Sequence, residues 1–156
     1  IIRKSAVGEV IITKVNLNGS GYKNNSLHYK KALNFTINFY IKKSVPNLDI
    51  GLLIKNQHDV NVAFTNISEM FGAKQKNLKP GKYRAEVTVP GKTLVPGIYY
   101  ATVSAHVRGY RDIDKLENIV QFTIVDTDSP LSGYGELASK LSCVFINAEW
   151  KLHRQY

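Results

Sequence analysis

Polar and aromatic side chains recur at every second residue of segment 99–108, in a mixture suited to binding sugars. A strand sends successive side chains to opposite faces, so the even-numbered residues of this segment share one face. Sugars present hydroxyl groups at fixed angles around a weakly apolar ring, and planar polar groups, hydroxyls and an aromatic ring match that chemistry. The sequence therefore predicts a carbohydrate-binding face that carries Tyr100, Thr102, Ser104, His106 and Arg108.

A second segment supplies Gln121 and Thr123, which alternate with apolar residues in the same way. We expect both to extend the face if their strand lies beside 99–108, and Asp49 and Lys55 to extend it from the other side. The same residues also fit a plain solvated sheet face, since antiparallel sheets commonly leave one face in water. Both interpretations stay open on the sequence alone.

The sequence offers little for catalysis, and we predict neither a cofactor nor a metal site. The four histidines, His28, His58, His106 and His153, lack the paired spacing of zinc ligands. His58 and Asp59 are neighbours, but neighbours on a strand point to opposite faces, which prevents one from orienting the other. No Gly-Lys-Ser/Thr phosphate loop is present, so we expect a binding domain rather than an ATPase or another enzyme.

Charge and composition narrow the class of partner. The 156 residues include 21 Lys and Arg against 12 Asp and Glu, a formal net charge of +9. The basic residues are scattered in ones and twos, without a recognition helix or an RNA-binding signature, so we expect no nucleic acid partner. The charge suits an acidic glycan and an anionic membrane surface equally well. The single cysteine, Cys143, leaves no disulfide within the chain.

The elements that must position these residues are β-strands, because the dominant hydrophobic period is two. Pro80-Gly81 and Pro96-Gly97 form two related turns, each followed two residues later by a tyrosine that opens the inward face of a strand. Only 67–76 is expected to hold a helical turn. About eight strands, which predict a sandwich or barrel, are expected near 8–17, 33–42, 48–56, 60–66, 83–89, 99–108, 120–124 and 141–150.

The chain divides into a core and a C-terminal extension. We expect residues 1–126 to form the core, and 127–156 to supply a linker and a C-terminal strand that complete the same domain. The segment 126–135 is rich in Ser, Gly and Asp, as linkers are. Trp150, the one tryptophan, is expected in the core rather than as a stacking platform. Because the sequence begins with Ile1 and its one methionine is Met70, we expect a piece of a longer protein.

Segments spread over almost the whole length resemble the C-terminal domain of the ATPase subunit of O-antigen polysaccharide ABC exporters (Wzt-type). The ordered combination of these segments carries the resemblance, which covers neither the loop 19–31 nor the residues after Trp150. The segments are Gly8-Glu9-Val10-Ile11-Ile12 with Val15 and Leu17, the run 47–56 (NLDIGLLIKN), the run 62–66 (VAFTN), the two Pro-Gly-X-Tyr turns and Trp150.

The resemblance implies an immunoglobulin-like antiparallel β-sandwich of about eight strands, joined in the parent protein to an ATPase domain outside this chain. It implies a non-catalytic domain that recognises O-antigen polysaccharide, at its non-reducing terminus, for export by the ABC transporter. It also implies a cytoplasmic place at the inner face of the inner membrane, where the parent protein meets the transmembrane exporter subunit.

Such exporters use two ATPase subunits, so the resemblance implies a homodimer. The strand near 141–150 either folds back on its own chain or is exchanged between protomers, and both alternatives stay open. The alternative function is a structural immunoglobulin-like domain that makes only protein contacts, which a contiguous exposed apolar patch would favour.

Overall fold

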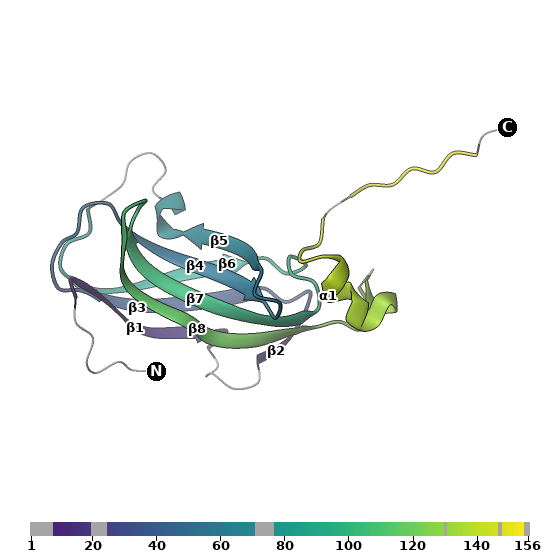
Figure 1. Cartoon of the computed structure of the whole chain (residues 1–156), viewed down its shortest axis with the longest axis horizontal. Helices are drawn as coiled ribbons and strands as arrows, with labels where there is room; N and C mark the ends of the chain where they lie inside the picture. The colour runs from purple at the N-terminus through teal and green to yellow at the C-terminus, as the bar shows by residue number, and fades with distance from the viewer. Residues whose placement is uncertain (1–7, 20–24, 71–76, 130, 147, 155–156) are drawn as a thin grey trace.

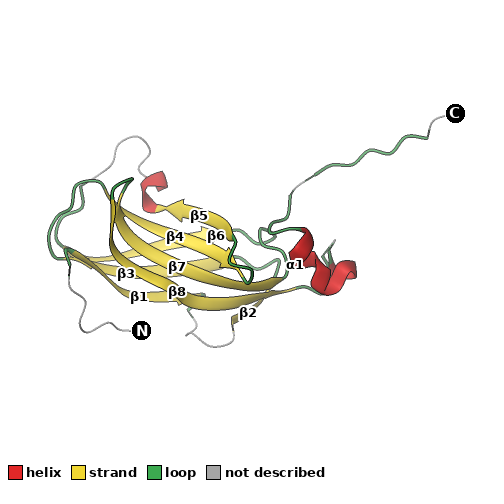
Figure 2. Cartoon of the chain, in the orientation of Figure 1, coloured by secondary structure: helices red, strands yellow, loops and turns green. Residues whose placement is uncertain are grey.

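Eight strands and three short helical segments make up the regular structure of the computed structural model (Figures 1 and 2). The structure describes residues 8–19, 25–70, 77–129, 131–146 and 148–154. The strands are β1 (Val10–Leu17), β2 (Asn25–His28), β3 (Leu33–Ile41), β4 (Leu48–Asn56), β5 (Asn61–Asn66), β6 (Gly81–Val89), β7 (Gly97–Val107) and β8 (Arg111–Val125). The helical segments are η1 (Ile67–Met70), η2 (Ser132–Leu137) and α1 (Ala138–Leu141).

The strands form two sheets that pack into a sandwich. The smaller sheet has the order β1-β3-β6, and the larger sheet has the order β2-β8-β7-β4-β5. Every pairing is antiparallel except that of β2 with β8. β8, β7 and β4 are the inner strands of the larger sheet, so β7 has a neighbouring strand on each side.

The core lies between the sheets and is built by strand alternation. In β3 every odd-numbered residue from Leu33 to Ile41 is buried, while the even-numbered residues face outward. Phe35 of the smaller sheet meets Phe122 of the larger sheet edge to face, with ring centroids 6.0 Å apart. Phe122 also stacks on Tyr99 at 5.6 Å. Because aromatic side chains bury large apolar areas, this cluster joins the two sheets.

The two Pro-Gly turns have the same local structure. Their glycines have φ values of 151° and 155°, in a region that residues with a side chain rarely adopt. The Tyr83 hydroxyl donates to the carbonyl of Lys79 at 2.8 Å, and the Tyr99 hydroxyl donates to the carbonyl of Val95 at 2.6 Å. Each tyrosine thus closes its own turn and begins its strand facing inward, as the sequence predicts. Burial raises the pKa of the Tyr99 phenol.

The all-β sandwich is confirmed, with three differences in its strands. β8 begins at Arg111, nine residues before the strand expected at 120–124. β2 was not expected, because its four residues show no alternation. The strand expected near 141–150 does not form within the described residues, where an isolated bridge between Leu94 and Val144 takes its place. The helical turn expected within 67–76 is present as η1, and residues 71–76 lie outside the described part. The expectation that this is the only helical segment is wrong, because η2 and α1 form in and after the stretch expected to be a linker.

The C-terminal segment extends away from the sandwich (Figure 1). Trp150 is 92% exposed and Leu152 is 99% exposed, so the expectation that Trp150 belongs to the core is wrong for the single chain. The reason is spatial, since the extended segment carries this side chain away from both sheets. Within the described residues, no helix has the length and apolar character needed to cross a membrane.

Candidate functional site

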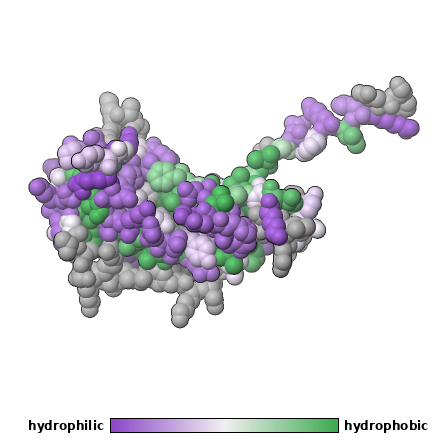
Figure 3. Space-filling view, viewed as in Figure 1, coloured by the Kyte–Doolittle hydropathy of each residue, from purple (hydrophilic) through white to green (hydrophobic). Residues whose placement is uncertain are grey.

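The outer face of the larger sheet carries the residues expected to bind carbohydrate. Tyr100 on β7 lies opposite Lys55 on β4 and opposite Gln121 on β8. His106, six residues further along β7, lies opposite Asp49 on β4. The neighbouring strands expected on each side of 99–108 are therefore in place. Figure 3 shows that the surface of the sandwich seen in this orientation is mostly hydrophilic.

The predicted residues of the face fall into two ends, with Thr102 between them. One end holds Tyr100, Gln121 and Thr123, and the other holds Ser104, His106 and Arg108. Thr102 lies between them and is only 5% exposed. Its hydroxyl accepts a hydrogen bond from the N–H of Asn118, at 3.0 Å, where β8 departs from regular pairing with β7. Thr102 therefore supports the sheet rather than presenting a free hydroxyl. The two ends are separated by about 20 Å, given a rise of about 3.3 Å per residue.

A buried carboxylate anchors the His106 end. Asp49 is fully buried, and its Oδ1 accepts hydrogen bonds from the N–H groups of Ile50 and Ser68, both at 3.1 Å. Its Oδ2 has no hydrogen bond, but the Nε of Arg108 lies 3.6 Å away. A buried charge requires pairing, so Asp49 holds the Arg108 side chain by its inner nitrogen. The terminal nitrogens of the guanidinium are then the ones that can meet a ligand.

His106 is fixed by a neighbour on its own strand. Its Nδ1 lies 3.0 Å from the hydroxyl oxygen of Ser104. Because this contact uses Nδ1, the second ring nitrogen, Nε2, is the one that can bind a ligand.

Phe64 on β5 is a residue of this face that the sequence reasoning missed. Its side chain is 56% exposed, and its ring centroid lies 6.4 Å from that of His106. The signal that could have found it is Gly51 in the adjacent strand, since a glycine inside a strand marks a close approach. The face therefore has an aromatic ring at each end.

A hollow of about 230 Å³ lies over the middle of the face, where Thr102 and Leu53 are among its lining residues. Lys55 and Lys115 reach into its lining, together with Glu117 and Asn118. Both lysines are paired, Lys55 with Asp59 at 3.0 Å and Lys115 with Glu117 at 3.3 Å. These pairs leave the hollow polar with little net charge.

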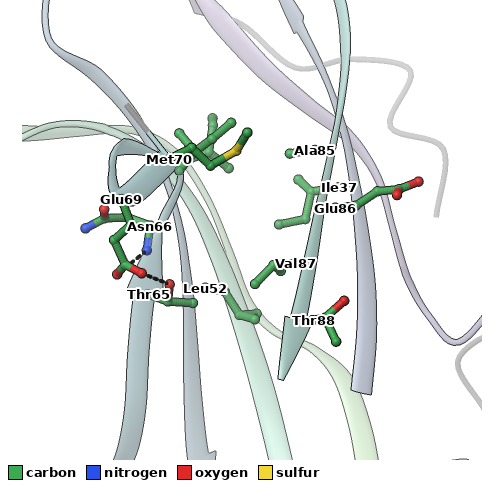
Figure 4. A pocket seen from close by; sticks show the side chains of 12 residues that line it. Ile37, Leu52, Thr65, Asn66, Glu69, Met70, Ala85, Glu86, Val87 and Thr88 are labelled. Carbon is green, nitrogen blue, oxygen red and sulfur yellow. Dashed lines mark hydrogen bonds between the residues drawn. The ribbon is translucent and has the colours of Figure 1, made fainter. Parts of the chain in front are cut away.

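A second hollow lies between the free edges of the two sheets, beside β5 and β6 (Figure 4). Its lining is largely apolar and includes Leu52, Val87 and Met70. The carboxylate of Glu69, at the rim, already accepts a hydrogen bond from the Thr65 hydroxyl at 2.9 Å. This hollow has polar groups as well, on Thr65, Asn66, Glu69, Glu86 and Thr88. We keep the outer face as the candidate site because it brings together the residues that the sequence predicts to bind sugar.

No group of three or more His, Cys, Asp or Glu side chains within the described ranges is arranged to hold a metal ion. We assign no metal or cofactor to the face.

Comparison with known proteins agrees with the fold. The chain is similar to a crystal structure of the C-terminal domain of Wzt, at 13% identity and a TM-score of 0.61, over 94% of this chain and 86% of that one. It is also similar to a Niemann-Pick type C2 protein from the Japanese carpenter ant, at 12% identity and a TM-score of 0.53, over 81% of this chain and 99% of that one. No curated protein matches the chain.

At such low identities the two structures show a shared fold and nothing finer. Evidence for the family comes from a family model, which matches the sequence itself over residues 3–137. That model describes the Wzt C-terminal domain, and the matched range takes in both sheets and every strand of the candidate face. This chain therefore belongs to the Wzt C-terminal domain family.

Proposed function

We propose that the chain is a non-catalytic carbohydrate-binding domain that recognises O-antigen polysaccharide for export by an ABC transporter. The observation that carries the proposal is a polar, aromatic-bearing sheet face in a member of the Wzt C-terminal domain family. In this proposal the non-reducing end of the glycan binds along the outer face of the larger sheet. The parent protein supplies the ATPase domain and meets the transmembrane exporter subunit at the cytoplasmic side of the inner membrane.

The chemistry of the face supports a sugar ligand. Tyr100 and Gln121 lie opposite each other and offer an aromatic ring beside an amide. At the other end, His106 is fixed by Ser104, and Arg108 lies close to the Asp49 carboxylate with its terminal nitrogens available to a ligand. Fixed donors lose little conformational entropy on binding, which favours recognition of hydroxyl groups set at fixed angles. The length of about 20 Å between the ends suits several consecutive sugars of a polymer.

We also propose a homodimer in which the C-terminal segment is exchanged. Ile146, Trp150 and Leu152 are all more than 80% exposed and occupy alternate positions with Ala148, as in a strand with one apolar face. Exposed apolar residues at this spacing are favourable only when another surface covers them. Exchange with a second copy would cover them, and the paired copies would match the two ATPase subunits of an exporter.

The second candidate is a protein-interaction domain without a glycan ligand. The exposed apolar residues of the C-terminal segment favour it, because they fit a protein partner as well as a second copy. It differs from the main proposal in leaving the outer face of the larger sheet unused.

Binding to O-polysaccharide purified from the source strain tests the proposal. The chain is titrated with this polymer and with an unrelated O-polysaccharide, at low and at moderate salt, while circular dichroism verifies the fold. We expect selective binding that survives moderate salt. Binding to both polymers that disappears with salt, or no binding by the folded chain, would refute a specific glycan site.

A further inference from the structure

We infer that Phe64 and His106 together form the surface on which a pyranose ring stacks, and that Gly51 is the residue that makes room for them. This inference rests on the proposed function and makes it more specific. It moves the centre of binding from Tyr100, on β7, to a pair of rings that β5 and β7 hold on the two sides of β4. We call this pair the Phe64–His106 platform.

Gly51 lies between the two rings on β4. It pairs with Asn66 of β5 on one side and with Ser104 of β7 on the other. A Cβ atom at Gly51 would lie 3.0 Å from Cε2 of Phe64 and 3.1 Å from Cε1 of His106. Contacts at these distances are tighter than nine in ten real Cβ contacts, so a side chain at this position would make the rings shift by a few tenths of an ångström. The rings converge over β4 because this position has none.

The platform is held on the histidine side by hydrogen bonding. Ser104 fixes the His106 ring through Nδ1 at 3.0 Å. Beyond it, the fully buried Asp49 holds Arg108 by Nε. His106 thus presents its Nε2 at the edge of the platform, and Arg108 follows two residues further along the chain. Both groups can bond to the hydroxyls of a stacked sugar.

The chemistry of this arrangement fits a pyranose better than a flat polar ligand or a fully apolar one. A pyranose has a face of C–H bonds, which gains by covering an exposed aromatic ring. Its hydroxyls project around the rim, where His106 and Arg108 lie. A single exposed phenylalanine is ordinary on a protein surface. Phe64 differs because its ring lies next to His106, which is held by a hydrogen bond. Gly51 in the neighbouring strand leaves the space in which the two rings meet.

The test is titration of the chain with O-polysaccharide from the source strain, using Phe64→Leu, Phe64→Trp and Gly51→Ala. Phe64→Leu keeps an apolar side chain but loses the ring, and we expect affinity to fall about fivefold to tenfold. Phe64→Trp keeps a ring and should restore most of the binding. Tyr134→Ala is the matched control, because Tyr134 is 54% exposed and lies on η2, away from the face. Its affinity should stay within about twofold of the wild type, a change below the effect of a stacked ring.

Gly51 is a positioning residue, so its effect must act through the rings. We expect Gly51→Ala to weaken binding severalfold in the wild type and much less in the Phe64→Leu background, as a double-mutant cycle measures. Saturation-transfer NMR supplies a second readout, because transfer from aromatic protons to sugar C–H protons should fall in Phe64→Leu and in Gly51→Ala. Phe64→Leu tests the platform even if Gly51→Ala fails to fold.

The outcomes separate this inference from the proposed function. If the wild type binds and Phe64→Leu and Gly51→Ala bind equally well, the platform is wrong and the glycan-binding function stands. If Gly51→Ala weakens binding equally in both backgrounds, the positioning role of Gly51 is wrong. If the folded wild type binds no O-polysaccharide, the proposed function and the platform are both refuted.

Discussion

Replacement of Tyr99 by phenylalanine should give a loss of stability that depends on pH in a calculable way. The Tyr99 side chain is 1% exposed, and its hydroxyl donates to the Val95 carbonyl at 2.6 Å. Tyr99→Phe removes this bond and leaves a buried carbonyl without its partner. Such a loss costs about 1–2 kcal/mol of unfolding free energy at pH 7.

The pH dependence follows from the pKa of the phenol, which burial and then the neighbouring Cys143 raise in the folded chain. A raised pKa means that the folded state keeps its proton where the unfolded state, with a pKa of about 10, has lost it. This stabilisation of the folded wild type is therefore complete below about pH 10 and is lost as the pH rises further. One unit above that value the wild type has lost about 1.4 kcal/mol from this group. Phenylalanine has no proton to lose, so the difference between the two proteins should shrink toward zero at about pH 11.

Urea unfolding followed by circular dichroism at pH 7, 9 and 11 measures this difference. Lysines and the other tyrosines titrate in both proteins, so their effects largely cancel in the comparison. Tyr83→Phe is the control for the loss of a similar bond at a half-buried site, with an expected cost of about 0.5 kcal/mol at pH 7. A gap between wild type and Tyr99→Phe that stays constant from pH 7 to pH 11 would show that the buried phenol does not behave as argued.

Three further changes test the candidate face and the C-terminal segment. Asp49→Ala should lower the unfolding free energy by about 1–2 kcal/mol, because it leaves the half-buried Ser68 N–H without its partner; a thermal midpoint equal to that of the wild type would contradict this. Arg108→Ala should weaken glycan binding and also lower the midpoint, because it leaves the buried Asp49 carboxylate without its cation; unchanged affinity of the folded variant would remove Arg108 from the site. A chain ending at Phe145 should lose the dimer in light scattering at unchanged circular dichroism, and a dimer that survives this truncation would rule out exchange of the segment.

The fold was predictable where period-two alternation and turn chemistry agreed. β3 and β7 alternate cleanly, and each Pro-Gly turn places a tyrosine two residues later. β2 was missed because its four residues show no alternation of apolar and polar side chains. Its parallel pairing with β8 depends on contacts between segments far apart in the sequence. The expected total of about eight strands holds only because the unforeseen β2 replaces the missing strand near 141–150.

The candidate face was predictable strand by strand but not across strands. Alternation correctly gave the outward residues of β7, yet it could not show that irregular pairing of β8 directs the Asn118 N–H to Thr102. Nor could it bring Phe64 beside His106, since that contact depends on the register of β5 and β7 against β4. The isolated glycine at position 51 was the one local signal of this contact.

Local ion pairing also bears on whether the net charge of +9 drives recognition. On the outer face of the larger sheet the cations have acidic partners: Arg108 with Asp49, Lys55 with Asp59, and Lys115 with Glu117. This face is therefore close to neutral, and binding there should depend weakly on salt.

The smaller sheet presents the opposite case. Lys14 and Arg84 lie on either side of Asn38 on its outer face, and Lys82 lies beside Tyr40. Arg84 pairs with Glu86 at 2.6 Å, whereas Lys14 and Lys82 have no acidic partner among the described residues. An acidic polymer attracted by charge alone would collect there and would be released by salt. A salt-resistant fraction of glycan binding that is lost with Phe64→Leu or Arg108→Ala would thus locate recognition on the larger sheet. A fraction lost with Lys82→Glu and with salt would report only the excess charge of the other face.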